Sequence, residues 1–283
     1  MIMEKYKKVI TTDFHEFDDK NKTYKNGIFE LEITSWQNFQ NIIKIFNENT
    51  DYFWRGQRED WQLKSSFDRK MSDIKKFLNA RNRQEALEII LKQFKKRLCD
   101  LPNGLNTKKD DEGWAIGQHY GLPTPLLDWT ADPYIAAYFA CYKKEKDDKR
   151  RVVYALNKAV KRLILKKKDP TTKQTLLRER FIDFLDLTST SDPNQNVRLH
   201  KQKGRFTKSL NGTDIGSNIS NYIRKSPEIT QNKEILLMKI LIPNTLVEEC
   251  LEHLKFEDIT HVKLFPDYSG VAEICKIDLN LEI

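Results

Sequence analysis

The sequence predicts an α+β fold, in which a mixed, mostly antiparallel central sheet is flanked by helices. Segments with the alternating pattern of strands are interspersed with segments of helical periodicity, without the regular spacing of βαβ units. No glycine-rich phosphate loop follows any strand pattern, so the sequence has no Rossmann signature. Of the 283 residues, 39% are hydrophobic, which is enough to form a substantial core.

We expect a single domain over residues 27–283, preceded by an irregular arm over residues 1–26. The arm contains mixed polar residues and shows no periodicity. A charged insertion is expected around residues 143–196, where runs of lysine and arginine are typical of solvated segments. No internal repeat divides the chain into smaller units.

The first third of the chain contains two strand patterns and two helical patterns. Residues 27–34 alternate apolar and acidic side chains, which predicts a strand with one buried face. Ser35 is suited to cap the helix that follows it. The aromatic segment 51–57 predicts the next strand, and residues 74–98 predict one long helix with lysine and arginine on its outer side.

Residues 118–141 combine a tight turn, a short apolar strand and an abrupt helix start. Gly121 can adopt a positive φ, and Pro123 restricts the residue before it to extended geometry. Asp132 is a natural helix N-cap, and Pro133 fits the first helical position because its missing N–H is not needed there. The helix that follows is apolar nearly all round, so we expect it to be buried.

The second half of the chain is predicted to supply most of the remaining sheet. Residues 152–156 and 234–242 read as strands, and residues 159–184 read as a helix interrupted at Pro170. Further strands are expected at residues 198–207, 262–266 and 273–279. The predicted core consists of Phe53, Leu126, Leu127, Ile135, Tyr138, Phe139, Val153, Leu236, Met238, Ile240 and Ile274.

Composition restricts the class of partner. The net charge of +8 permits a nucleotide or nucleic-acid partner without requiring one. The five histidines and four cysteines show no metal-ligand spacing, and we expect Cys141 and Cys275 to be reduced core residues. No apolar run reaches the length of a membrane span, and the N-terminus lacks an apolar signal region. We therefore expect a cytoplasmic protein without a membrane partner.

Four blocks of the sequence resemble the FRG domain family, which is named for a Phe-Arg-Gly motif. They are Phe53-Trp54-Arg55-Gly56-Gln57, then His119 to Ala140, then Arg198 to Thr207, and finally Leu264-Phe265-Pro266-Asp267 with Gly270. Pro125 departs from the pattern, because family members often have arginine there. The resemblance implies a protein that acts on a nucleotide, in the setting of a bacterial toxin or of phage defence.

Arg55 and His119 are the two side chains of these blocks with the clearest chemical potential. The planar fork of Arg55 suits bidentate capture of phosphate or carboxylate, and its alternative is a structural ion pair with Asp128. His119 could act as a general base, contact a ribose or stack on a ligand, and its alternative is a structural hydrogen-bonding role. We predict that Arg55, His119 and Asp128 line one pocket.

Other residues of the motifs are assigned to ligand binding. Asp128 could orient Arg55 or His119, or cap a turn. Trp129 could stack on a base, although tryptophan at such a position is more often a core residue. Gln202 could read the edge of a nucleotide through its amide. The predicted ligand-binding set is Gly56, Gln57, Tyr120, Asp128, Trp129, Thr130 and Gln202.

A more distant resemblance links three segments to ADP-ribosyltransferases of the Arg-Ser-Glu class. These segments begin at Phe53, Leu127 and Glu234. The resemblance implies NAD as substrate, with Arg55 on a phosphate and Glu234 stabilising an oxocarbenium-like transition state. Glu234 would then be catalytic together with Arg55 and His119, and it should face their pocket. Alternatively, Gln202 stands in the position of the acid, as a binding-only domain would require.

Two functions follow from these resemblances. The first is an effector that transfers ADP-ribose or cleaves NAD, with a nucleic acid or a protein as the acceptor. The second is a non-catalytic module that senses a nucleotide or a nucleic-acid end. In both cases a small-molecule nucleotide is the expected partner, and no metal or resident cofactor is assigned.

Overall fold

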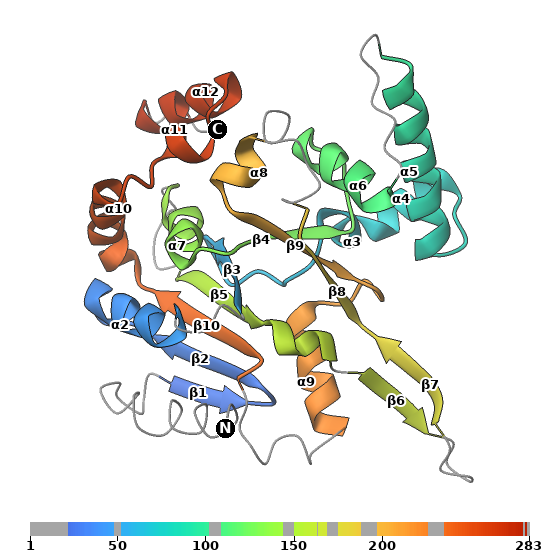
Figure 1. Ribbon diagram of the computed structural model, residues 1–283, viewed down its shortest axis with the longest axis horizontal. Helices are drawn as coiled ribbons and strands as arrows, with labels where there is room; N and C mark the ends of the chain where they lie inside the picture. The colour runs from blue at the N-terminus through green and yellow to red at the C-terminus, as the bar shows by residue number, and fades with distance from the viewer. Residues whose placement is uncertain are drawn as a thin grey trace.

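The computed structural model describes most of the chain, and its path is drawn in Figure 1. The described residues are 22–47, 52–101, 109–143, 150–162, 164–168, 175–187, 197–225, 235–279 and 281. Glu234, the predicted catalytic acid, lies outside them.

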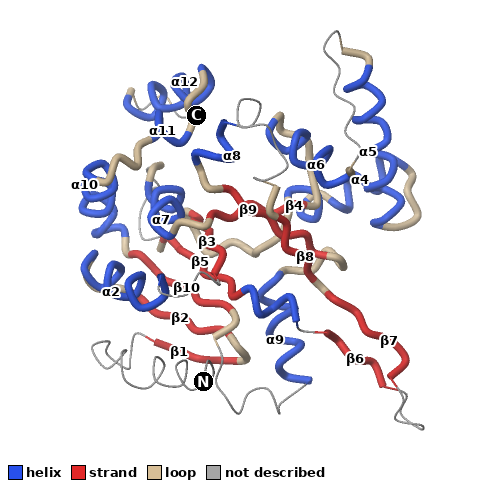
Figure 2. The backbone as a smooth tube through the Cα atoms, in the orientation of Figure 1, coloured by secondary structure: helices blue, strands red, loops and turns tan. Residues whose placement is uncertain are grey.

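An eight-stranded sheet forms the centre of the described structure, in the order β1-β2-β10-β5-β3-β4-β9-β8. Its strands are β1 (Lys22–Lys25), β2 (Ile28–Glu32), β3 (Tyr52–Gln57), β4 (Leu126–Thr130), β5 (Arg151–Asn157), β8 (Ile182–Leu185), β9 (Gly204–Ser209) and β10 (Leu237–Ile242). The pair β2–β10 is parallel, and the other neighbours in this sheet are antiparallel. The predicted mixed, mostly antiparallel α+β fold is therefore confirmed. A separate hairpin of β6 (Ile164–Lys168) and β7 (Thr175–Arg180) projects from the β8 end of the eight-stranded sheet (Figure 2).

Helices cover both faces of this sheet (Figure 1). On one face α2 (Trp36–Asn47), α7 (Pro133–Cys141) and α10 (Val247–Phe256) pack on Trp54 and its neighbours, and on the other α9 (Ile215–Lys225) packs on Phe53 and its neighbours. This division follows the alternation of side chains along β3. The other helices are α3 (Ser66–Arg69), α4 (Met71–Leu78), α5 (Arg83–Cys99), α6 (Asp110–His119), α8 (Val197–Lys201), α11 (His261–Leu264) and α12 (Tyr268–Asp278), with short turns η2 (Lys158–Arg162) and η4 (Asn244–Leu246).

The start of α7 has the predicted cap. The Asp132 carboxylate accepts hydrogen bonds from the main-chain N–H groups of Tyr134, at 2.9 Å, and Ile135, at 3.3 Å, and Pro133 follows at the first helical position. The helix is buried along almost its whole length, as predicted. Among its inward-facing residues, the small side chains of Ala136 and Ala140 allow β3 to approach closely.

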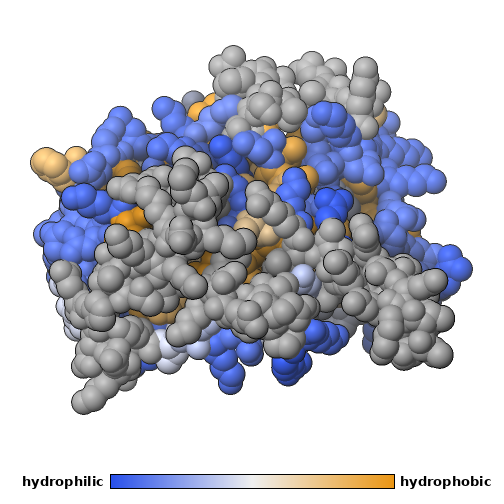
Figure 3. All heavy atoms as spheres, turned by 60° about the horizontal axis from the view of Figure 1, so that its bottom comes forward, coloured by the Kyte–Doolittle hydropathy of each residue, from blue (hydrophilic) through white to orange (hydrophobic). Residues whose placement is uncertain are grey.

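The predicted core is largely confirmed. Leu236 and Ile240 are fully buried, as predicted, with Leu236 directly before β10 and Ile240 within it. Phe139 and Ile274 are the exceptions, because both are only partly buried. On the face that Figure 3 shows, hydrophilic residues cover most of the described surface, and hydrophobic residues are seen mainly in recesses between them. No helix among the described residues has both the length and the apolarity needed to cross a membrane.

Several predicted elements are wrong near the ends of the chain. Residues 22–25 of the expected irregular arm form β1, which pairs with β2. The predicted strands 262–266 and 273–279 are the helices α11 and α12. Asp267 initiates α12 by accepting a hydrogen bond from the main-chain N–H of Gly270 at 3.0 Å, and this cap outweighs the strand-like apolar pattern. Cys275 is consequently exposed on a helix instead of buried in a strand.

Three predictions in the middle of the chain are also corrected. The expected single helix over residues 74–98 is divided into α4 and α5 at Asn79, whose φ of 51° ends α4 in a left-handed conformation. The expected helix over residues 159–184 is instead the turn η2 followed by β6, β7 and the start of β8. The expected strand 198–207 begins as α8 and becomes strand only at Gly204.

Candidate functional site

A cavity of about 410 Å³ opens where β3 and β4 separate. These two strands share a single registered pair, Trp54 with Thr130, whereas β4 pairs with β9 along its whole length. Beyond that pair, the carboxyl end of β3 and the amino end of β4 leave a gap in the sheet. Residues from α6, α8, β9 and the end of α11 complete the wall of this central cavity. Its volume lies within the range of about 300–1,000 Å³ that is typical of ligand pockets.

Arg55 bridges the gap from β3 to β4. Its Nε donates to the Oε1 atom of Gln57 at 2.9 Å, and its Nη1 donates to the main-chain carbonyl of Asp128 at 2.7 Å. Gln57 is buried, and its own Nε2 donates to the carbonyl of Trp61 at 2.8 Å. Gln57 therefore holds the guanidinium in place and has its amide engaged by the protein. The Nη2 group of Arg55 is left for other partners.

The carboxylate of Asp128 is open to the cavity and is held from the side by Gln118. The Nε2 atom of Gln118 donates to Asp128 Oδ1 at 2.5 Å, while its Oε1 accepts a hydrogen bond from the Thr124 hydroxyl. Protein surrounds this carboxylate apart from the cavity, and this burial raises the pKa of Asp128. The nearby charge of Arg55 and the bond from Gln118 act in the opposite direction.

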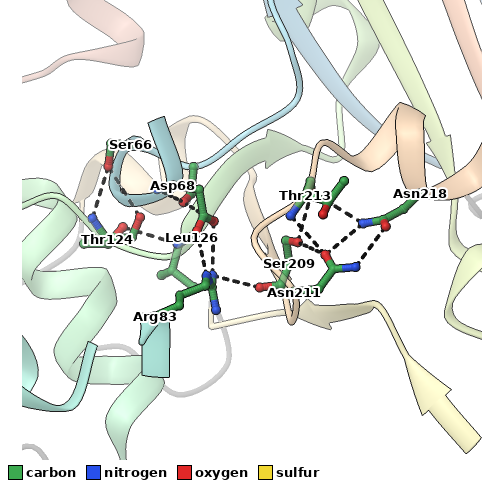
Figure 4. Close-up of polar contacts among 10 residues, drawn as sticks. Ser66, Asp68, Arg83, Thr124, Leu126, Ser209, Asn211, Thr213 and Asn218 are labelled. Atoms are coloured by element: carbon green, nitrogen blue, oxygen red, sulfur yellow. Dashed lines mark hydrogen bonds and ion pairs between the residues drawn. The ribbon is translucent and has the colours of Figure 1, made fainter. Parts of the chain in front are cut away.

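A buried polar network fixes the turn that carries Thr124 (Figure 4). The main-chain N–H of Thr124 donates to the hydroxyl of Ser66 on α3 at 3.1 Å. Next to it on the same helix, Asp68 forms a two-point ion pair with Arg83 of α5, at 2.7 Å and 3.1 Å. Arg83 also donates to the main-chain carbonyl of Ser209 at 3.0 Å, which ties these helices to the end of β9.

His119 ends α6 at the rim of the cavity and is exposed. Partial burial lowers the pKa of His119, and the charge of Arg198 lowers it further, against an opposing effect of Asp267. The ring of His119 meets that of Tyr120 edge to face, with ring centres 4.9 Å apart. Tyr120 itself is 78% exposed and is not part of the cavity wall.

The wall opposite β3 comes from the C-terminal part of the chain. Arg198 on α8 forms a two-point ion pair with Asp267, and its guanidinium lies 5.1 Å from the ring centre of Phe265. This arginine holds the pKa of Asp267 well below its usual range. Gln202 donates through Nε2 to the carbonyl of Leu264 at 3.0 Å, so its amide also joins α8 to the C-terminal helices.

Trp129 and Thr130 are also part of the wall, but their side chains are buried in the protein. The indole of Trp129 packs in the core with Phe53 and donates to the hydroxyl of Thr207 at 2.8 Å. The Thr130 hydroxyl accepts a hydrogen bond from the main-chain N–H of Asp132 at 3.0 Å. For Trp129, this geometry agrees with the core alternative and leaves no face of the indole for stacking on a base.

The described wall of the cavity has an excess of positive charge. Its arginines are Arg55, Arg58, Arg198 and Arg205, and the carboxylate among the lining residues is Asp128. Asp267 pairs with Arg198, and Asp186 approaches Arg205 to 3.2 Å. Four guanidinium groups thus face three carboxylates in and around the wall, an arrangement that favours an anionic ligand.

Residues 50–149 match the FRG domain family. The chain carries an FRG domain. The matched segment includes β3, α6, β4 and α7, and with them Arg55, His119 and Asp128. The opposite wall of the cavity, with Arg198, lies beyond the segment that matches the FRG domain. Neither the curated proteins nor the solved structures contain a match to this chain.

The central cavity brings together most of the residues singled out from the sequence. Arg55, His119 and Asp128 line it, as expected for one pocket. The other members of the predicted set in its wall are Gly56, Gln57, Trp129, Thr130 and Gln202. Within the described residues, β10 contributes nothing to this wall. Its first residue, Leu237, pairs with Leu156, which pairs with Phe53, so β10 begins at the end of β3 away from Gly56.

Gly56 allows the backbone of α7 to approach β3 closely. A side chain at this position would place its Cβ 1.8 Å from the main-chain oxygen of Ala136 on α7. The glycine thus allows the helix backbone to lie directly on β3. Because the helix already occupies this space, Gly56 contributes to the cavity mainly by the position of its backbone.

Sequence reasoning assigned no site role to several polar residues that line the central cavity, among them Arg58, Gln118, Tyr142, Arg198 and Arg205. Gln118 directly precedes His119, and Arg58 directly follows Gln57. Their position next to predicted site residues could have indicated that they line the same cavity. Arg205 lies between the buried residues Gly204 and Phe206 on β9. Among the described residues, no group of three or more His, Cys, Asp or Glu side chains could hold a metal ion.

A buried histidine supports the C-terminal side of the cavity. The Nδ1 atom of His261 lies 3.1 Å from the Tyr138 hydroxyl, and its ring stacks on Phe265 with centres 4.5 Å apart. Burial lowers the pKa of His261, and the charge of Lys143 lowers it further. Glu273, whose Oε2 atom is 3.9 Å from Nε2, acts in the opposite direction.

The lowered pKa of His261 predicts a loss of stability in acid. The unfolded chain binds a proton at this residue near its ordinary pKa of about 6.5, where the folded protein does not. The contribution of His261 is therefore present above this pH and decreases as the pH falls towards the folded-state pKa. Thermal unfolding is measured between about pH 8 and 5. As the pH falls, the melting temperature of the native protein should decrease more steeply than that of His261→Gln. Equal slopes would contradict this account.

Proposed function

We propose that this protein binds a nucleotide in the central cavity, with its phosphate groups against the arginines. The observation that carries the proposal is the excess of guanidinium groups around a cavity of about 410 Å³. Arg55 is held by Gln57 and by the Asp128 carbonyl, so its Nη2 group is oriented before a ligand arrives. An arginine fixed in this way loses little side-chain entropy when it binds a phosphate.

A catalytic version of this function is the transfer of ADP-ribose or the cleavage of NAD by an effector of bacterial toxin or phage-defence type. In that reaction the bond from the anomeric carbon to nicotinamide breaks, and the electron pair leaves with nicotinamide. Water or an acceptor then bonds to the anomeric carbon and loses a proton. The Asp128 carboxylate is suited to stabilise the positive charge that develops on the ribose. His119, with its lowered pKa, is suited to accept the proton.

A non-catalytic sensor of a nucleotide or a nucleic-acid end is the second candidate. It is favoured by the engagement of the polar groups in the wall with the protein itself. The Asp128 carboxylate is bonded to Gln118, and the Gln202 amide is bonded to the Leu264 carbonyl. Such a site can recognise a ligand through fixed polar groups without a reaction at the ribose.

The test of binding compares Arg55→Ala with the native protein. NAD, ADP-ribose and AMP are titrated calorimetrically, with Arg224→Ala as the control because Arg224 is exposed on α9 and lies outside the cavity. Arg55→Ala should weaken binding about 100-fold or more, since two charge-assisted hydrogen bonds to phosphate are lost. Absence of binding by the native protein to all three ligands would refute the proposal.

The test of catalysis follows nicotinamide release from NAD. Asp128→Asn and Glu234→Gln are measured for turnover and for NAD binding separately. If Asp128 is the essential anion, Asp128→Asn should lose turnover by about 10²–10³-fold and retain binding. The same loss in Glu234→Gln alone would assign the role to Glu234. Binding of NAD by the native protein without turnover would favour the sensor.

A further inference from the structure

A second cavity, of about 710 Å³, lies beside the central one and is formed largely by α12. Its polar lining consists of Arg58, Lys143, Ser269, Glu273 and Lys276. Three of these side chains are cationic and one is anionic. The described lining of this side cavity therefore also has an excess of positive charge, although it belongs to a different part of the fold.

The two cavities adjoin. Arg58 lines both of them. Tyr142 of the central cavity donates through its hydroxyl to Glu273 of the side cavity at 3.4 Å. Arg198 of the central cavity likewise donates to the Ser269 hydroxyl of the side cavity at 2.5 Å. Arg58 is thus the side chain along which a ligand in the central cavity would reach the side cavity.

The negative charge in the side cavity is already engaged by protein groups. Glu273 accepts the Tyr142 hydrogen bond and forms an ion pair with Lys143 at 2.9 Å. Arg58 and Lys276 add two further positive charges to the same wall. Lys276 is exposed on α12, so its ammonium group can reach a ligand in the cavity at little cost in desolvation.

We infer that the ligand contains two nucleosides joined through phosphate, one held in the central cavity and the rest extending along Arg58, Lys143 and Lys276. This inference rests on the proposed function and specifies its ligand class. The central cavity accommodates the first nucleotide beside Arg55, while the side cavity adds about 710 Å³ of space and the cations for a further phosphate-linked unit. A pyrophosphate dinucleotide such as NAD and the end of a nucleic-acid strand share this chemistry.

The test compares the affinities of AMP, NAD and the RNA dinucleotide pApA at low and moderate salt. At least one of the two-unit ligands should bind about tenfold more tightly than AMP, and its affinity should fall more steeply with salt. A gain for NAD alone would identify the pyrophosphate dinucleotide, and a gain for pApA alone would identify the nucleic-acid end; either supports the inference. Equal affinities for all three would overturn it and leave nucleotide binding intact.

The contribution of the side cavity is tested with Lys276→Glu. This variant should lower the affinity for the two-unit ligand by about tenfold and leave the affinity for AMP unchanged, because AMP does not reach α12. Lys263→Glu is the matched control, since Lys263 lies on α11 and lines neither cavity. Equal losses in the two lysine variants, or no loss in Lys276→Glu, would overturn the inference. Failure of all ligands to bind the native protein would instead refute the proposed function, and the inference with it.

Discussion

Replacing Gly56 with alanine is expected to destabilise the protein by about 3 kcal/mol or more. The new Cβ would lie 1.8 Å from the main-chain oxygen of Ala136 and 2.6 Å from the main-chain nitrogen of Ala140. Both contacts are with helix backbone, which cannot rotate away as a flexible side chain can. Because α7 is buried against α2, α10 and the sheet, its displacement would disturb the largest core cluster.

Chemical denaturation provides the measurement for Gly56→Ala, and Gly216→Ala provides the control. Gly216 lies in α9, where the nearest atom to an added Cβ is a carboxylate oxygen of Asp214 at 3.3 Å. Alanine there should change the unfolding free energy by less than about 1 kcal/mol, since its helix propensity offsets the close contact. A loss of similar size in both variants would show that α7 can move away from β3.

Replacing Asp68 with alanine is expected to cost about 3–5 kcal/mol, because it leaves the charge of Arg83 without its partner. The Asp68 side chain is 2% exposed and that of Arg83 is 19% exposed, so water can compensate only in part. The substitution also removes a hydrogen bond from the Ser65 hydroxyl at 2.7 Å. The network in Figure 4 should loosen, and with it the turn that orients Gln118 and Asp128.

A double-mutant cycle separates the ion pair from the rest of the network. Arg83→Met together with Asp68→Leu should be less destabilised than the sum of the two single variants, because no unpaired charge remains. An additive result would show that the pair itself contributes little. Lys263→Ala, at an exposed position, is the control, and its free energy of unfolding should lie within about 0.5 kcal/mol of that of the native protein.

Local chemistry made part of this fold predictable from the sequence. Asp132 and Pro133 determine the start of α7 within a few residues, and the short apolar run around Leu236 and Ile240, which ends at Pro243, favours a buried strand. The convergence of Arg55, His119 and Asp128 was also predictable, because each follows or ends an apolar segment that must enter the core. Packing between segments places their polar ends together.

Other parts depended on contacts that a periodic pattern does not contain. The apolar residues of α12 read as a strand, because the pattern does not show the hydrogen bond by which Asp267 begins a helix. Arg198 and Phe265 lie 67 residues apart in the sequence, and only the folded chain places the guanidinium over the ring. Likewise, the role of Gly56 depends on the approach of α7, which neither segment encodes alone.

The strand order has a consequence for synthesis of the protein on the ribosome. β3 is synthesised early, but its neighbour β5 begins only at Arg151. β4 likewise cannot pair with β9 until the chain has been synthesised beyond Gly204. β2 lies beside β10, so this region of the sheet is completed only after Ile242 has left the exit tunnel. Pairings of such long sequence separation form slowly and leave strand edges exposed in the meantime. The nascent FRG segment should therefore need chaperones until the later strands emerge.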